Sequence, residues 1–285
     1  MLIVWSLALL ALLGIVFALG LSFASRAFHV DSDPRIDEIA ELLPGANCGG
    51  CGYAGCSAAA EAVVKGDAPA NVCPALDSEA AKAVADIMGV EFVEREPEIA
   101  VVQCRGAGVE QRFAYDGVQD CRAAMLVQGG ALACAYGCLR LGTCVQVCPF
   151  DAMEMGPDGL PRAISGKCTA CGKCVEACPR DLITIVSVKK AIHVLCRSHE
   201  KGGAVKKICE VGCIGCKKCE KECPFDAIHV TDFLAEIDYE KCKVCGKCVK
   251  VCPTGAIVNL RKKKKTDAGQ EAKEDQPVEE VTAAT

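Results

Sequence analysis

The chain has 285 residues, of which 24 are cysteines and 5% are aromatic, and its formal net charge is −5. This length exceeds one typical domain, and so few aromatic residues leave little material for a conventional core. The acidic balance, without interleaved basic and aromatic residues, argues against nucleic acid as a partner. Cysteine at this density indicates either a disulfide scaffold or a set of metal centres. Because most cysteines recur every three residues, too close for easy pairing, the spacing favours metal centres.

Residues 1–25 are predicted to form a transmembrane anchor. The segment MLIVWSLALLALLGIVFALGLSFAS has no charged side chain, and Arg26 follows it. About two dozen apolar residues can cross a hydrocarbon core of ~30 Å. A cleaved signal peptide is the alternative, although the basic segment that normally begins one is missing. The position of Arg26 favours a single-pass protein with its N-terminus outside and its body in the cytoplasm, where thiols stay reduced.

Residues 35–95 are predicted to form a small iron-sulfur domain. The segment PGANCGGCGYAGCSAAAEAVVKGDAPANVCP (44–74) contains a C-x2-C-x4-C-x16-C pattern, with glycines that let the backbone wrap a bulky group. Four thiols suffice for one [4Fe-4S] cluster, and zinc in a glycine-rich loop is the alternative. The alanine-rich stretch after the third cysteine favours a short helix that ends at Gly66. The expected ligands are Cys48, Cys51, Cys56 and Cys73.

The C-terminal part repeats one plan four times: a cysteine loop ending in Cys-Pro, a short turn and an apolar, β-forming run. The segments are CLRLGTCVQVCPFDAMEM (138–155), CTACGKCVEACPRDLITI (168–185), CIGCKKCEKECPFDAIHV (213–230) and CKVCGKCVKVCPTGAIVN (242–259). Their spacing predicts two tandem two-cluster ferredoxin-like modules, at 96–188 and 189–260. The expected fold class is α+β. Residues 261–285, basic and then acidic without apolar periodicity, are expected to be a disordered tail.

The repeated loops predict cluster ligands. In C-x2-C-x2-C-x3-C-P, three cysteines of one loop hold a cluster, and the cysteine before proline ligates the other cluster of the pair. The first loop has Leu141 where its middle cysteine would stand, so we expect Cys134 to replace it. Structural zinc also uses C-x2-C, but not this interlocked array. The expected sets are Cys134, Cys138, Cys144 and Cys178; Cys168, Cys171, Cys174 and Cys148; Cys213, Cys216, Cys219 and Cys252; and Cys242, Cys245, Cys248 and Cys223.

Five clusters leave four cysteines over, Cys104, Cys121, Cys196 and Cys209. They are buried free thiols, or the four ligands of a sixth cluster, or alternate ligands, with Cys209 substituting for a neighbour. VVQCRG around Cys104 resembles HVLCRS around Cys196, and Cys209 precedes its loop by the same spacing as Cys134. An iron count separates these possibilities, because five cubanes need about 20 irons and six need about 24.

Clusters in series on a membrane-tethered chain indicate a relay of single electrons. The sequence has no dinucleotide-binding glycine motif, no P-loop and no hydrolytic constellation, so the chain is expected to work within a larger assembly. One alternative is an iron-sulfur subunit of another membrane redox enzyme, such as a hydrogenase or dehydrogenase relay. Another is a non-catalytic carrier, which must release its cluster.

The apolar N-terminus, LPGANCGGCGYAGC, CAYGCLRLGTCVQVCPFDA and the ferredoxin-like pairs together resemble the B subunit of the Rnf complex. The resemblance covers nearly the whole chain apart from the tail. It implies a translocase that couples electron flow from reduced ferredoxin to NAD⁺ to export of Na⁺ or H⁺. It also implies a position on the cytoplasmic side of the bacterial cell (inner) membrane and reduction by soluble ferredoxin. The Cys48–Cys73 centre is expected to pass electrons to the membrane partners, because it lies closest to the anchor. The implied partners are a peripheral NADH- and FMN-binding subunit and membrane subunits with covalent flavin and further iron-sulfur sites. Two ferredoxin pairs exceed a minimal version with one.

Overall fold

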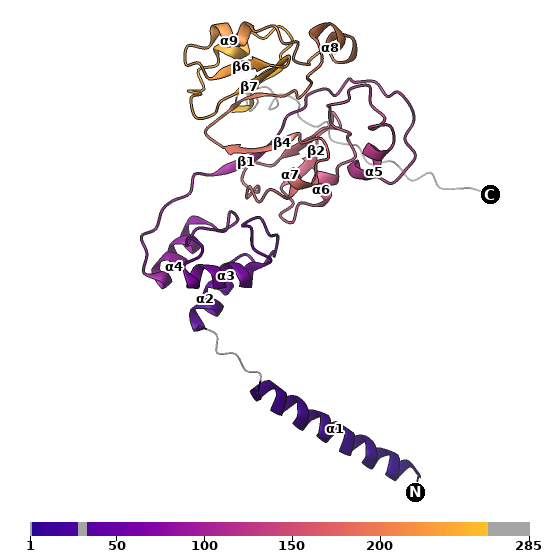
Figure 1. The fold of residues 1–285 in the computed structure, drawn as a ribbon, viewed down its shortest axis with the longest axis vertical. Coiled ribbons are helices and arrows are strands. Elements are labelled where there is room, and N and C mark those ends of the chain that lie inside the picture. Colours follow the sequence, from indigo (N-terminus) through magenta and orange to yellow (C-terminus); the bar gives the residue numbers. More distant parts are fainter. Residues whose placement is uncertain (1, 28–32, 262–285) are drawn as a thin grey trace, which may run out of the picture.

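The computed structural model describes residues 2–27 and 33–261. A long N-terminal helix, a small helical domain and two α+β units follow one another along the chain (Figure 1). The expected α+β class is confirmed. The expected disordered tail lies outside the described residues, apart from Arg261.

Helix α1 (Leu2–Ala27) stands apart from the domains. Its segment Val4–Arg26 is, among the described residues, the one helix long and apolar enough to cross a membrane, and none of the apolar window is buried. Large apolar side chains such as Trp5, Phe17 and Phe23 are exposed along it. A lipid environment would remove this continuous apolar surface from water.

The small domain consists of α2 (Pro34–Leu42), α3 (Cys56–Lys65) and α4 (Ser78–Met88). Asp77 caps α4, because its carboxylate accepts the Ala80 N–H at 2.7 Å. The expected helix after Cys56 is confirmed, and α3 ends at Gly66 with φ of 81°. Fully buried Ile39 of α2 joins the alanine face of α3 in one core. This packing fixes the N-terminal end of α3, where Cys56 lies.

The two α+β units have the same strand pairing. In each, the first strand pairs antiparallel with the last, and the two middle strands form a hairpin. The strands are β1 (Glu98–Val102) with β4 (Ile183–Ser187), β2 (Met153–Met155) with β3 (Pro161–Ala163), β5 (Ile192–Val194) with β8 (Ile257–Asn259), and β6 (Ile228–Thr231) with β7 (Leu234–Ile237). Short helices lie between them: α5 (Cys121–Leu126), α6 (Thr143–Gln146), α7 (Lys173–Ala177), α8 (Gly202–Ile208), α9 (Lys218–Glu222) and α10 (Lys247–Val251). Each unit has its own small core, in which buried cysteines pack beside aliphatic side chains.

The buried side chain of His193 on β5 should make the stability of the second unit depend on pH. The side chain is 2% exposed, its Nδ1 lies 2.8 Å from the Tyr239 hydroxyl, and burial lowers its pKa from 6.5 to about 4. The unfolded chain therefore binds a proton near pH 6.5, which the folded chain binds only near pH 4. The free energy of unfolding should fall as the pH drops through this window, by about 3 kcal/mol at most.

We expect His193→Gln, which can still bond Tyr239, to lose less stability than the wild type between pH 7 and pH 5. Guanidinium unfolding at the two pH values, followed by loss of the cluster absorption, measures this. Equal shifts of the midpoint in both proteins would contradict the assignment to His193.

Candidate iron-sulfur sites

The four cysteines expected in the small domain lie together. Burial raises the pKa of Cys73, the Ala75 backbone N–H opposes this rise, and the thiolates of Cys51, Cys48 and Cys56 add to it. The Cys56 N–H donates to Asn47 Oδ1 at 2.8 Å, which ties the glycine-rich loop to the start of α3. The loop turns at Gly49 and Gly52, whose positive φ values suit glycine. These four thiols are therefore close neighbours, as the ligands of one cluster must be.

The four repeated loops share one backbone conformation. In every loop the second and fourth residues after the first cysteine have positive φ, and so does the third residue after the Cys-Pro cysteine. Alternating handedness turns successive N–H groups toward a common point, a concavity found at many iron-sulfur sites. The first loop therefore has the shape of its siblings, although Leu141 replaces its middle cysteine. The residues are Arg140, Ala170, Gly215 and Val244; Gly142, Gly172, Lys217 and Gly246; and Asp151, Asp181, Asp226 and Gly255.

Three further sets lie together as the spacing suggests. In each, burial raises the pKa of one thiol, and the other three thiolates of its set add to the rise: Cys174 to about 12, Cys219 to about 12 and Cys248 to about 11. A bare thiol set of this kind keeps its protons, and iron that binds there displaces them. Two of the sets line cavities of about 20 Å³ each, Cys213, Cys216, Cys219 and Cys252, and Cys242, Cys245, Cys248 and Cys223.

In the first-loop set, Cys121 occupies the place that was expected for Cys134. Burial raises the pKa of Cys144 to about 12, and the thiolates of Cys138, Cys121 and Cys178 add to this. The same four cysteines line a cavity of about 20 Å³, to which Cys134 does not contribute. The structure therefore groups the thiols differently from the expected set, in which Cys134 had this place.

A polar link holds Cys121 there. Asp120 caps α5, and its carboxylate accepts the N–H groups of Arg122 and Ala123. The Cys121 N–H donates to Thr143 Oγ1 at 2.7 Å, and this hydroxyl donates to Asp120 Oδ2 at 3.1 Å. Because Thr143 begins α6 directly before Cys144, the link fixes α5 beside the loop. The sequence suggested Cys121 only as a free thiol or a ligand of a sixth cluster, because a cysteine on a separate helix has no local spacing to the first loop.

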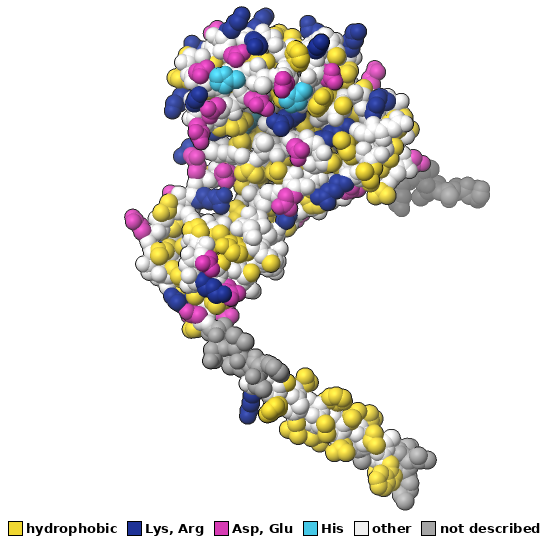
Figure 2. All heavy atoms as spheres, in the orientation of Figure 1, with side chains coloured by type: hydrophobic (Ala, Val, Ile, Leu, Met, Phe, Trp, Pro, Cys, Tyr) yellow, Lys and Arg dark blue, Asp and Glu magenta, His cyan; other side chains and the backbone are white. Residues whose placement is uncertain are grey.

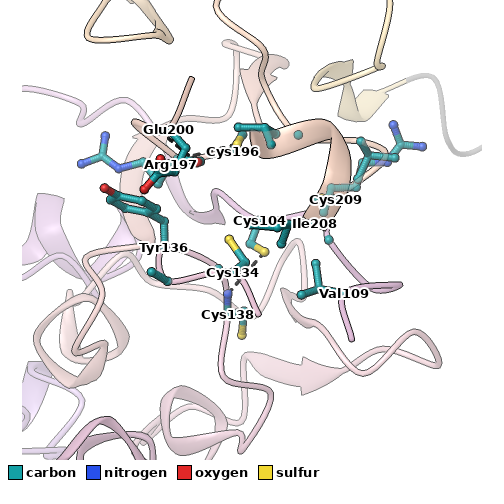
Figure 3. A pocket seen from close by; sticks show the side chains of 18 of the residues that line it. Cys104, Val109, Cys134, Tyr136, Cys138, Cys196, Arg197, Glu200, Ile208 and Cys209 are labelled. Atoms are coloured by element: carbon teal, nitrogen blue, oxygen red, sulfur yellow. Dashed lines mark hydrogen bonds between the residues drawn. The ribbon is translucent and has the colours of Figure 1, made fainter. Parts of the chain in front are cut away.

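The remaining four cysteines, Cys104, Cys134, Cys196 and Cys209, line a larger cavity of about 270 Å³ where the two α+β units meet. Figure 3 shows Cys104 and Cys134 side by side in its middle, whereas the sulfur of Cys138 points away from them. Of the expected sixth set, the structure thus brings together Cys104, Cys196 and Cys209, but not Cys121.

The donor sets are chemically suited to iron-sulfur clusters, because each consists of four cysteine thiols. Backbone N–H groups donate to several of the sulfurs, as at Cys148 (3.3 Å) and Cys178 (3.4 Å). Such bonds stabilise thiolates around an iron-sulfur cluster.

Comparison with known proteins agrees with this chemistry. A family model for an Fe-S cluster domain matches residues 43–75, and models for a 4Fe-4S dicluster domain match 133–183, 212–257 and 167–227. The B subunit of the ion-translocating oxidoreductase complex of Methanosarcina acetivorans is 52% identical over 239 residues, which are 83% of this chain and 90% of that protein. The chain belongs to this B-subunit family.

Two other relatives in the B-subunit family have more specific names. The Acetobacterium woodii protein, from a Na⁺-translocating ferredoxin:NAD⁺ oxidoreductase complex, is 44% identical over 82% of this chain and 71% of its own length. The Clostridium ljungdahlii protein, from a proton-translocating complex, is 45% identical over 84% and 86%. The expected family is therefore confirmed, as are [4Fe-4S] binding and a role as a subunit of an ion-translocating oxidoreductase.

Proposed function

We propose that this chain is the membrane-anchored electron-relay subunit of a complex that couples transfer between ferredoxin and NAD⁺ to movement of Na⁺ or H⁺. The main observation is that its cysteine sets adjoin one another from the small domain into the first α+β unit. When bound, [4Fe-4S] clusters accept and release single electrons. Five such clusters are held by the Cys48 set, the Cys168, Cys213 and Cys242 loop sets, and Cys121 with Cys138, Cys144 and Cys178.

The small domain adjoins the second loop very closely. A Cβ at Gly50 would lie 2.5 Å from the Cys171 carbonyl oxygen, so only a glycine allows this approach. Burial raises the pKa of Cys171, and the thiolate of Cys48 adds to it from across the contact. Cys174 of the second loop lies in turn close enough to Cys144 of the first loop for its thiolate to raise the pKa of Cys144. These contacts support an electron path from the first unit to the domain next to the anchor.

We infer that the cysteine-bearing domains lie on the cytoplasmic side. Arg26 is in the last turn of α1, on the side that leads to the domains, and basic residues flank membrane helices on the cytoplasmic side. Cluster ligands must be thiolates rather than disulfides, and the cytoplasm keeps thiols reduced.

We propose that soluble ferredoxin docks at the outer end of the second unit. Residues 189–260 carry 13 Lys and Arg against 9 Asp and Glu, although the whole chain is acidic. Cys216 and Cys245 are exposed among exposed lysines, and Figure 2 shows basic side chains gathered over this end of the molecule. An acidic face on ferredoxin would be steered there by charge. The lysines are Lys217, Lys218, Lys221, Lys241, Lys243, Lys247 and Lys250.

Charge reversal tests both docking and function. Lys218 and Lys247 begin α9 and α10, next to cluster loops. In the complex purified from membranes, Lys218→Glu with Lys247→Glu should raise the KM for ferredoxin in NAD⁺ reduction ~10-fold at low salt. Added salt should narrow this difference, because it screens exposed charges.

Lys82→Glu, an exposed lysine of α4 in the small domain, is the matched control and should leave this KM unchanged. A double variant with the wild-type KM at low salt would show that ferredoxin docks elsewhere. Absence of ferredoxin-dependent NAD⁺ reduction in the intact complex would overturn the proposed function itself.

A further inference from the structure

We propose that Cys104, Cys134, Cys196 and Cys209 hold a sixth [4Fe-4S] cluster, at the junction of the two α+β units. This inference rests on the proposed function, because it assigns the other twenty cysteines to five clusters. Cys104 follows β1 and Cys134 precedes the first loop, whereas Cys196 follows β5 and Cys209 is the C-cap of α8. Each unit therefore supplies two of the four ligands, and the cluster would join the units.

Because Gly106 and Gly137 have no side chain, they keep the space between the sulfurs open. A Cβ at Gly106 would lie 3.2 Å from the Cys209 sulfur and 3.9 Å from the Cys104 sulfur. A Cβ at Gly137 would lie 3.3 Å from the Cys134 sulfur and 3.7 Å from the Cys104 sulfur. Neither glycine has positive φ, so the backbone does not require glycine at these positions. The missing side chains instead keep room beside the sulfurs, as a cluster needs.

Backbone N–H groups at the junction point at sulfur. The Cys138 N–H donates to Cys104 Sγ at 3.4 Å, and the Ser198 N–H donates to Cys196 Sγ at 3.5 Å. The second bond repeats the geometry of the first loop, where the Arg140 N–H donates to Cys138 Sγ at 3.4 Å, also from two residues further along. Such N–H···S bonds support thiolate ligands of a cluster.

Two half-buried arginines put positive charge beside the site. Arg140 Nη2 donates to the Gly106 carbonyl at 2.6 Å, and Arg180 Nη1 donates to the Cys134 carbonyl at 2.9 Å. Arg180 Nη1 also donates to the Gly137 carbonyl, in the same loop. The Nε atoms of both arginines are buried without a hydrogen-bond partner among the described residues. A buried cation is costly unless negative charge compensates it, and a thiolate-ligated cluster supplies that charge.

The junction adjoins a cluster set on either side. Cys104 accepts its bond from Cys138, a member of the first-loop set. On the other side, half-buried Cys196 packs against the core that contains Cys213. Cys213 belongs to the third-loop set. A cluster at the junction would therefore connect the two units into one series of six sites.

Iron analysis of the full chain tests this. Purified in detergent and reconstituted anaerobically with iron and sulfide, the wild type should bind about 24 irons. Assembly at the junction releases one proton from each of its four thiols. Cys196→Ala with Cys209→Ala should reduce the count to about 20 and remove one centre from the Mössbauer and EPR spectra. Gly106→Ala with Gly137→Ala should do the same while keeping every cysteine.

Gly108→Ala is the matched control, because a Cβ there would meet nothing within 4 Å, and it should keep about 24 irons. A wild-type count of about 20, or 24 irons in the Cys196/Cys209 variant, would overturn the sixth cluster. The glycine variants give the answer if the cysteine variants do not fold. Reduction of the wild-type clusters by ferredoxin is measured separately. A count of about 20 irons would overturn the sixth cluster without affecting the proposed relay, and clusters that ferredoxin does not reduce would overturn the relay without affecting the iron count.

Discussion

Replacing Cys51 by alanine is expected to abolish ferredoxin-dependent NAD⁺ reduction, while ferredoxin still reduces the clusters of the two α+β units. Cys51 is one of four thiols in the small domain, and the neighbouring Cys73 is 8% exposed. Removal of one ligand leaves the other three without a complete donor set, so this site should lose its cluster or keep a damaged one. The small domain directly follows α1 in the chain, and its loop adjoins Cys171. Electrons that reach the second loop would then have no acceptor on the way to the membrane.

EPR of the reduced complex should show the loss of one centre in Cys51→Ala, with the other signals kept. Tyr53→Phe, in the same loop, retains the aromatic packing against the domain core and should behave as the wild type. NAD⁺ reduction at the wild-type rate in Cys51→Ala membranes would mean that electrons leave the chain by another site.

The parts of the fold that follow from the sequence are those encoded locally. The spacing of cysteines with Cys-Pro fixes a loop, a short turn and a strand within about twenty residues, and the four loops share even their left-handed positions. The helix after Cys56 was predictable for the same reason, since its composition and Gly66 lie next to each other in the chain.

The exchange of Cys121 and Cys134 could not be read from the sequence, because it depends on contacts between distant segments. Cys134 has the spacing of a loop ligand, but Arg180 holds its carbonyl on the junction side. Cys121 has no such spacing, but the Asp120 and Thr143 side chains fix it beside Cys144. Similarly, Cys209 aligns with Cys134 in the repeat because both positions face the junction cavity. The repeat shows that Cys134 and Cys209 are equivalent positions, but only the packing of the two units shows that both line the same cavity.

Gly50→Ala tests whether electrons cross between the second loop and the small domain. The added Cβ would lie 2.5 Å from the Cys171 carbonyl oxygen and 2.9 Å from its Cα, so the backbones of the two loops must separate. Gly50 has no positive φ, and alanine can therefore keep the local fold and all four ligands of the small domain. Iron content should stay unchanged, whereas ferredoxin-dependent NAD⁺ reduction should fall, because a wider gap between the two loops slows electron transfer across it. Gly203→Ala on α8, where a Cβ meets nothing within 4 Å, is the control. Wild-type rates in Gly50→Ala would place the crossing elsewhere.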